Sequence, residues 1–406
     1  MSDVLEELRA FLAAQLPPVW VDAMATGDDA AIDEQREAMD RRAFVRLLGA
    51  AGWVAPHWPV EHGGRGLDAA TGREALAELD RWRVPRVPRG SGLSLAAPTI
   101  IEWSDDGVKR RFLPNIVTGE ERWCQLFSEP GAGSDLASLA TSAVRDGDEW
   151  VINGQKVWTT LGHQSEFAML LARTDNTVPK HNGITYFAMD MHAPGVEVRP
   201  LVQMTGEWEF NEVFLTDVRV PDAHRISPVG KGWSATTTTL TAERHTLSGA
   251  SVKRRPSDEI LGGMTFDQVL ALARDRSVTR DPLWRDRIVR EYAKSRVLAM
   301  TSVRSRAAAA SGRPPGPEGS VTKIAKASAN QSLQVLAMDI LGAGGTAWPA
   351  DDVATPEFVR QFLRTRANSI EGGTSEIQRN IVGERVLGLP REPDLYRGEP
   401  WNTIPR

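Results

Sequence analysis

Cysteine is nearly missing from this sequence, which contains one residue of that type, Cys124. A single cysteine excludes an internal disulfide framework and a cysteine-rich metal site, and no metal site is expected. A run of about twenty apolar residues is also missing, so we expect no membrane-spanning helix. The net charge is −5 and the basic residues are dispersed, which argues against a nucleic-acid surface. In residues 1–16 the apolar residues recur at helical spacing with charged residues between them, which favours a helix over a signal peptide. We therefore expect a soluble, cytoplasmic protein.

A G-x-G-x-x-G segment following a strand is missing too, which argues against a nicotinamide-binding Rossmann domain. What the chain does contain is a hydrophobic pattern whose period changes twice. The pattern predicts helices in residues 1–122, short strands in 123–230 and helices again in 231–406. Because helices and strands are segregated along the chain, we predict an α+β fold with these three ranges as its domains.

Turn residues separate the predicted strands. The runs are 149–151, 168–172, 184–189, 196–202 and 212–220. Gly147-Asp148 and Asn153-Gly154 are typical of hairpin turns. In the last region we predict helices over 286–309 and 324–341. Residues 251–263 and 311–319 are rich in proline, glycine and charge, so we expect them to form exposed loops.

The segment Ser128–Asp135 (SEPGAGSD) follows an apolar run that ends at Phe127. Its closely spaced glycines allow the backbone to approach a flat or anionic ligand, and the Ser134 hydroxyl can donate and accept hydrogen bonds. A simple strand-ending turn explains the same residues equally well.

Three further segments could carry chemistry. In Gly154–Thr160 (GQKVWTT), a tryptophan and two hydroxyls could cover a flat heterocycle, although a strand tryptophan is more often part of the core. Ile340–Gly345 (ILGAGG) is a glycine-rich turn. Ile370–Asn380 (IEGGTSEIQRN) predicts a helix capped at Ser375 and Gln378 and closed by Gly388 and Pro390. Its glycine-lined start could bind a phosphate or a thioester carbonyl, or could simply be a well-capped helix.

Together with Trp53–Gly66 (WVAPHWPVEHGGRG), these segments resemble the acyl-CoA dehydrogenase family in order and spacing over nearly the whole chain. The resemblance implies an N-terminal helical domain, a middle β-domain and a C-terminal four-helix bundle. It also implies FAD as cofactor, held between the β-domain and the C-terminal helices. A second subunit closes such sites, so a homodimer, a homotetramer or a heterotetramer with a related chain is implied.

The site residues that the resemblance implies fall into two groups. The FAD contacts are Gln125, Phe127, Ser128, Gly133, Ser134, Trp158, Thr160, Asp339, Gly342, Ala343, Thr374 and Glu376. The acyl-CoA contacts are Ser134, Arg244, Gly372 and Gly373. Asp339–Ala343 matches the turn that the neighbouring subunit usually supplies.

The reaction of this family needs a carboxylate that removes the α-proton of the thioester while the β-hydrogen leaves as hydride to flavin N5. Such a base needs a dry site that raises its proton affinity. In part of the family it directly precedes a Gly-Thr pair, a position that is Gly372 here, with Glu371 one residue earlier. In isovaleryl-CoA and long-chain types it precedes an arginine on an earlier helix, which matches Glu243. Glu243 also falls on the helix face that carries Trp233, Leu240 and Leu247. A structural ion pair is the alternative; we predict Glu243 as the base and Glu371 as the second candidate.

Two departures from the family pattern concern the half of the FAD site that lies between subunits. The usual Phe-Gly pair is missing near residues 274–282, where Arg276 or Arg280 could supply a phosphate contact. Asp339 stands where relatives often have glutamine. Both departures raise the possibility of FAD bound by a mixed pair of related chains.

The resemblance implies an acyl-CoA dehydrogenase that passes electrons to an electron-transferring flavoprotein, in fatty acid or steroid side-chain β-oxidation. A flavin oxidase or monooxygenase on the same fold is an alternative, and so is a partner subunit of a mixed complex. The base position and Gly372 favour a bulky, branched or polycyclic acyl group.

Overall fold

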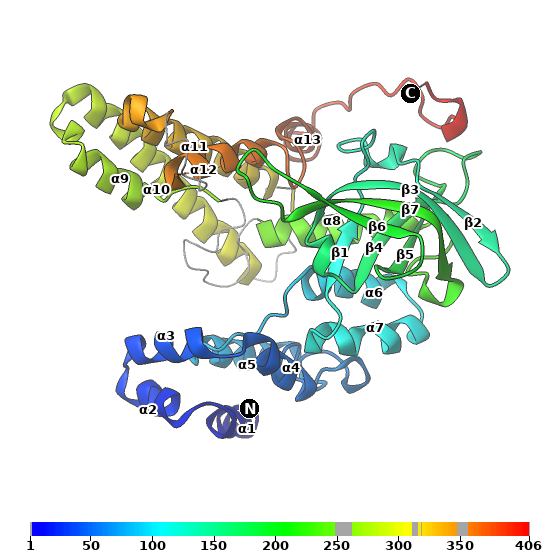
Figure 1. Cartoon of the computed structure of the whole chain (residues 1–406), viewed down its shortest axis with the longest axis horizontal. Helices are drawn as coiled ribbons and strands as arrows, with labels where there is room; N and C mark the ends of the chain where they lie inside the picture. The colour runs from blue at the N-terminus through cyan, green and yellow to red at the C-terminus, as the bar shows by residue number, and fades with distance from the viewer. Residues whose placement is uncertain (1, 248–261, 311–315, 318, 347–355, 406) are drawn as a thin grey trace.

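The computed structural model describes residues 2–247, 262–310, 316–317, 319–346 and 356–405. A helical N-terminal part, a curled sheet and a helical C-terminal part follow one another along the chain (Figure 1). The predicted α+β class and the order of helices, strands and helices are confirmed. Within the described residues, no helix is both long and apolar enough to cross a membrane.

Four of the N-terminal helices are capped by an aspartate. The bounds of the N-terminal helices are α1 Ser2–Gln15, α2 Pro18–Thr26, α3 Asp29–Ala38, α4 Arg41–Ala50, α5 Ala69–Arg81, α6 Ala97–Trp103 and α7 Asp106–Thr118. Asp28, Asp40, Asp68 and Asp105 precede α3, α4, α5 and α7, and each carboxylate accepts hydrogen bonds from backbone N–H groups of the first turn. These caps satisfy donors that the helix itself leaves without acceptors.

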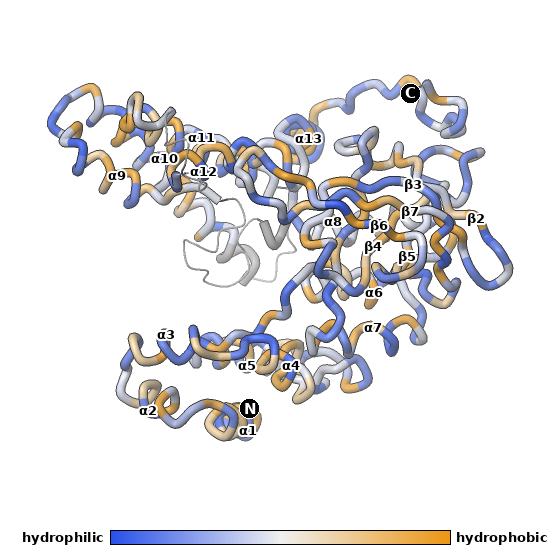
Figure 2. Tube along the Cα trace, in the orientation of Figure 1, coloured by the Kyte–Doolittle hydropathy of each residue, from blue (hydrophilic) through white to orange (hydrophobic). Residues whose placement is uncertain are grey.

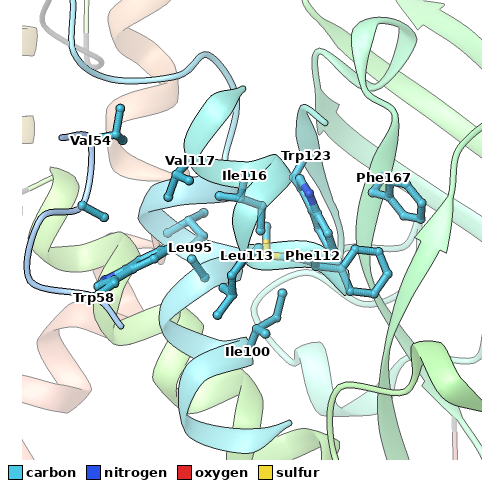
Figure 3. Packing of buried hydrophobic residues seen from close by; sticks show 14 of the residues in the cluster. Val54, Trp58, Leu95, Ile100, Phe112, Leu113, Ile116, Val117, Trp123 and Phe167 are labelled. Carbon is cyan, nitrogen blue, oxygen red and sulfur yellow. The ribbon is translucent and has the colours of Figure 1, made fainter. Parts of the chain in front are cut away.

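The N-terminal helices and the sheet share one hydrophobic core. Phe112 of α7 packs edge-on against Trp123 and Phe167, with ring centroids 5.2 and 5.1 Å apart (Figure 3). All three aromatic side chains are buried. Because Trp123 and Phe167 begin neighbouring strands, this contact holds the strand ends against α7.

Seven strands among the described residues form one sheet in the order β1-β4-β2-β3-β7-β6, with β5 paired to β4. Their bounds are β1 Trp123–Leu126, β2 Ser142–Asp146, β3 Glu149–Thr160, β4 Phe167–Arg173, β5 Ile184–Asp190, β6 Val196–Leu201 and β7 Phe210–Pro221. β1 runs parallel to β4, whereas β5 and β7 run antiparallel to their partners β4 and β3. Every residue of β4 is buried, and Figure 2 shows hydrophobic stretches in this part of the chain.

One of the two predicted hairpin turns is correct. Gly147-Asp148 joins β2 to β3, and Gly147 has a φ of 66°. The Asn153-Gly154 prediction is wrong, because β3 continues through both residues to Thr160. A Cβ on Gly154 would lie 2.4 Å from Thr141 Oγ1, so this glycine permits close backbone approach in place of a turn.

The C-terminal helices are α8 Gly232–Leu247, α9 Phe266–Asp275, α10 Pro282–Ala310, α11 Gly319–Leu341, α12 Glu357–Arg364 and α13 Ser375–Ile381. Helices were predicted over 286–309 and 324–341, and α10 and α11 confirm both with longer bounds. Figure 1 shows α9 to α12 extending away from the sheet. The loops predicted at 251–263 and 311–319 fall mostly outside the described residues.

Candidate active site

The two motif segments Ser128–Asp135 and Gly154–Thr160 lie side by side. Val157 donates its backbone N–H to Ser128 O at 2.9 Å. Lys156 Nζ donates to Phe127 O at 3.0 Å and to Glu129 Oε1 at 2.8 Å. The loop after β1 and the end of β3 are therefore one structural unit, built around a buried ion pair.

The environment of that pair shifts the pKa values of both residues downwards, for different reasons. Lys156 is 0% exposed and Glu129 8%. Burial opposes ionisation of Glu129, but the Lys156 ammonium and the hydrogen bonds from Thr141 and Ala140 together outweigh it and hold the pKa of this carboxyl below its usual value. Burial lowers the pKa of Lys156, and the Glu129 carboxylate opposes that change. Glu129 also accepts backbone N–H groups of Ala140 and Thr141, at 2.6 and 2.9 Å, so its oxygens are well supplied with donors.

The sequence reading did not single out Glu129 or Lys156. The sequence nevertheless contains a signal for a buried lysine. Strand alternation places Lys156 on the same face of β3 as Trp150 and Ile152, which are both buried. A lysine at an inward strand position needs a buried acid, and the neighbouring motif contains one.

Trp158 stands in a strained conformation at the end of β3. Its φ is 60°, in the left-handed region that tryptophan rarely adopts. Between Lys156 and Thr159 the pairing with β7 shifts, so two residues of β3 face one of β7. Such a bulge re-aims a side chain. The Trp158 side chain is 56% exposed and contacts Phe210 edge-on at 5.8 Å, so most of its indole surface is open to a ligand.

The remaining predicted contacts of this unit differ in exposure. Phe127 is buried and packs edge-on against Tyr186 at 5.7 Å, whereas Gln125 and Ser128 are half-buried. The exposed positions are Gly133, Ser134 and Thr160. A Cβ added to Gly133 would meet no atom within 4 Å, so the loop leaves open space beside this glycine.

Helix α8 places Glu243 one turn after a buried hydroxyl cluster. Thr239 Oγ1 lies 2.7 Å from Thr99 Oγ1 of α6 and 3.1 Å from Tyr186 Oη of β5. Residues four apart share a helix face, so Glu243 follows Thr239 on the side packed against the sheet. Burial raises the pKa of Tyr186, and the Glu243 charge acts in the same direction. Glu243 itself is half-buried and has an interaction partner.

The apolar stripe predicted on α8 is only partly correct. Trp233 and Leu240 are partly buried against the core, but the deepest positions are Ala235, Thr236 and Thr239, each 0% exposed. Threonines can be buried here because their hydroxyls form hydrogen bonds within the helix. Thr236 Oγ1, for example, donates to Gly232 O at 2.7 Å. The side chains of Arg244 and Leu247 lie outside the described residues.

Glu371 is held in a separate ion pair on the C-terminal helices. Arg364 Nη1 and Nη2 donate to its two carboxylate oxygens at 3.1 and 3.0 Å, and Asn368 Nδ2 donates at 3.0 Å. Such bidentate pairing fixes the carboxylate as an acceptor. Glu371 is therefore ion-paired with Arg364 on the C-terminal helices, while Glu243 lies on α8 beside α6 and β5.

The start of α13 has a different cap from the predicted one. Thr374, not Ser375, is the N-cap, and its side chain accepts the N–H of Ile377 at 3.2 Å. Gly372 and Gly373 have φ values of 62° and 89°, so the glycines are required by the backbone before the cap. The Gln378 side chain donates to Gly372 O at 3.0 Å instead of completing a capping box with Ser375. Gly388, with a φ of 69°, follows the end of this helical segment as predicted.

Within one chain, the Asp339–Ala343 turn lies far from Gly373. Lys323, near the start of α11, donates to Gly373 O at 2.7 Å. Asp339 follows on the same helix, about 24 Å further along its axis at 1.5 Å per residue. Asp339 pairs with Arg287, and Gly342 and Ala343 are exposed. One chain alone therefore does not bring the predicted contacts at Asp339–Ala343 close to those near Gly373.

The remaining charged residues that were considered as FAD contacts are exposed on the C-terminal helices. Glu376 pairs with Arg379 at 3.1 Å. Arg276 and Arg280 flank α9 and the short helix after it. Their charges are accessible to a phosphate, and their positions fit a solvated basic loop equally well.

The chain matches one protein family over most of its length. Models of the acyl-CoA dehydrogenase N-terminal, middle and C-terminal domains match residues 2–120, 124–218 and 230–387. Acyl-CoA dehydrogenase IpdE1 of Mycobacterium tuberculosis is 40% identical over 395 residues, which cover 97% of this chain and 99% of that protein.

Two solved structures show the same fold at comparable coverage. The "Tcur3481-Tcur3483 steroid ACAD" has 29% identity and a TM-score of 0.70, covering 96% of this chain and 98% of that one. The ChsE4-ChsE5 complex from Mycobacterium tuberculosis has 28% identity and a TM-score of 0.65, with coverage of 96% and 98%.

Proposed function

The chain belongs to the acyl-CoA dehydrogenase family and is an oxidoreductase that dehydrogenates acyl-CoA; on that premise we propose that Glu243 is its base and FAD its cofactor. The observation that carries the choice of base is the place of Glu243 on α8. Glu243 lies one turn after Thr239, on the α8 face that packs against buried Tyr186 of β5, whereas Glu371 lies among the C-terminal helices, where Arg364 and Asn368 donate to it.

The residues around the Ser128–Asp135 loop fit a flat heterocycle. The exposed indole of Trp158 offers an aromatic face, and the exposed Ser134 and Thr160 offer hydroxyls from the same two joined segments. When bound, FAD accepts the hydride that leaves the β-carbon. The strain at Trp158 is consistent with such a role, since strained residues gather at ligand sites.

In this proposal Glu243 takes the α-proton and so becomes neutral. The acyl thioester lies between α8 and the Ser128–Asp135 loop, with Ser134 on the CoA arm. Backbone N–H groups near Gly373 and the Arg244 side chain complete the acyl-CoA contacts. A base in this role needs a site that excludes water, and Leu240, three residues before Glu243, packs against the hydrophobic core.

The test is reduction of bound FAD by acyl-CoA under anaerobic conditions. Glu243→Gln should keep its FAD and lose at least about a thousandfold in the rate of flavin bleaching, because no other group removes the proton. Glu371→Gln is the matched control and should bleach at close to the wild-type rate. Full activity of the Glu243→Gln enzyme would reject Glu243 as the base.

We propose a bulky, branched or polycyclic acyl group. The support is the position of Glu243 on α8, the glycine at position 372, and the likeness to a structure described as a steroid ACAD. A panel of acyl-CoA esters decides this point, with the fastest bleaching expected for a polycyclic ester. Fastest bleaching by short straight-chain esters would contradict it.

We propose that the enzyme works as an oligomer with a second chain, and that an electron-transferring flavoprotein takes its electrons. The support is the distance between Asp339 and Gly373 within one chain, and the two-chain complexes among the similar structures. The protein should be purified alone and, separately, together with a co-expressed related chain. The yellow colour of bound FAD is expected only in the assembly that completes the FAD site. Slow reoxidation in air and fast reoxidation by the flavoprotein are expected; fast reoxidation in air would favour an oxidase.

A further inference from the structure

The end of the chain returns to the sheet after a long exposed stretch. Every residue from 385 to 399 is exposed, and Trp401 is then 7% exposed, the most buried position among residues 385–405. Figure 1 shows this segment leaving α13 and passing over the sheet. Residues 391–394 and 396–399 of this stretch, together with Glu384 and Pro179–His181, line a cleft of about 660 Å³. The stretch therefore spans a gap and is attached at its far end.

The attachment is made to the loop between β4 and β5. Trp401 and Asn402 donate their backbone N–H groups to Val178 O and Asn176 O, each at 3.0 Å. Pro400 lies in an antiparallel bridge with Pro179. The Arg173 guanidinium lies over the Trp401 ring, 4.1 Å from its centroid. A buried arginine on an indole face is a favourable cation–π contact.

Arg173 connects Trp401 to the segment that follows the Ser128–Asp135 loop. Its Nε donates to Leu139 O at 3.0 Å, and its Nη2 donates to Ala137 O at 2.6 Å. Its Nη1 donates to Lys180 O at 3.1 Å. Both acceptors at 137 and 139 belong to the segment that directly follows Asp135, and both residues are buried.

A second connection joins the same two loops. Lys180 Nζ donates to both carboxylate oxygens of Asp135, at 2.8 and 2.9 Å. The Ser138 hydroxyl also donates to Asp135, at 2.5 Å. Residues 135–139 are thus held from one side by Lys180 and from the other by Arg173, whose guanidinium is covered by Trp401.

We propose that Trp401 and Arg173 are positioning residues for the acyl-CoA contact at Ser134. Trp401 fixes the plane of the Arg173 guanidinium, and Arg173 fixes the carbonyls of Ala137 and Leu139. These carbonyls in turn fix Ser134, which directly precedes the held segment 135–139. The tail of the chain therefore determines how well the loop is arranged for the CoA arm. This inference rests on the proposed role of Ser134 in acyl-CoA binding.

The test compares Trp401→Ala, Trp401→Phe and Leu395→Ala in the FAD-loaded assembly. Leu395 lies in the same tail, is 85% exposed, and serves as the matched control. Trp401→Ala should raise the KM for acyl-CoA about tenfold with kcat and FAD content unchanged, as loss of a desolvated cation–π contact would. Trp401→Phe should recover most of the wild-type KM because phenylalanine also offers a ring face, and Leu395→Ala should leave KM unchanged.

Amide hydrogen exchange gives a readout that does not depend on catalysis. The N–H groups of Ser138 and Leu139 donate to Asp135 O and Leu136 O, at 3.0 and 3.1 Å, so they report directly on the held segment. In Trp401→Ala they should exchange faster than in the wild type and in Leu395→Ala. Wild-type exchange together with a wild-type KM in Trp401→Ala would overturn the inference. A wild type whose flavin no acyl-CoA reduces would instead reject the proposed function, while the exchange comparison would still decide the role of Trp401.

Discussion

The Lys156 ammonium lies 2.8 Å from a carboxylate oxygen of Glu129, with both side chains buried. This pair connects the loop after β1 to the end of β3, the two segments that we propose for FAD. Replacing one partner would leave the other as an uncompensated charge in the interior.

Glu129→Gln and Lys156→Met should therefore each lower the free energy of unfolding by about 3–5 kcal/mol. The double variant should lose much less than the sum, because neither charge is then buried alone. Denaturant unfolding of all four proteins measures the coupling. If the two single losses simply add, the pair does not hold these segments together.

Glu371 and Arg364 should behave as a structural pair. Glu371→Gln keeps one acceptor oxygen, so we expect a loss of about 1–3 kcal/mol in stability with flavin bleaching nearly unchanged. Arg364→Gln should destabilise similarly. Thermal unfolding and stopped-flow bleaching measure the two quantities. A Glu371→Gln enzyme that is stable but fails to bleach its flavin would transfer the role of base from Glu243 to Glu371.

Trp158→Gly should separate stability from ligand binding. Glycine adopts the φ of 60° without steric cost, so the flavin-free protein should be no less stable, and more stable by up to about 1 kcal/mol. FAD should nevertheless dissociate more readily, since the exposed indole is lost. Trp208, 54% exposed and without a positive φ, is the matched control: Trp208→Gly should gain no stability. FAD retention equal to wild type in Trp158→Gly would remove the indole from the proposed site.

Asp222 should contribute a pH-dependent part of the stability. Hydrogen bonds from Arg225, and from Trp150 at 2.8 Å, lower the pKa of Asp222 from 3.8 to about 2. Since the folded-state pKa is depressed, this stabilisation is complete above about pH 4 and is lost as the pH falls towards about 2. Asp222→Asn should be less stable than wild type at about pH 5, and the difference should shrink on acidification. Unfolding midpoints of both proteins at several acidic pH values measure it; a constant difference would be the contrary result.

Cys124 should be inert while the protein is folded. Burial raises the pKa of the Cys124 thiol to about 12, so at neutral pH almost none is thiolate. A thiol reagent should find no reactive group in the native protein and one in denaturant. Rapid labelling of the native protein would show that β1, and with it the start of the Ser128–Asp135 loop, opens readily.

The sequence by itself determined the type and order of the elements. Helical and strand periods are local properties, and they predicted α10, α11 and the strands β4 to β7 with errors of a few residues. The ordered motifs were sufficient to identify the family. Local signals failed where a distant residue intervened: Gly154 is a glycine because Thr141 approaches it, not because the chain turns there.

Only the tertiary structure decided which charged side chains are occupied and which side chains hold the loops. Glu243 lies in α8 and Glu371 shortly before α13, and the fold places Arg364 against Glu371 and Tyr186 against Thr239, one turn before Glu243. Likewise, nothing near Trp401 in the sequence indicates Arg173. Such pairings join residues far apart in the chain, and their energies depend on burial, which the fold creates and local periodicity does not encode.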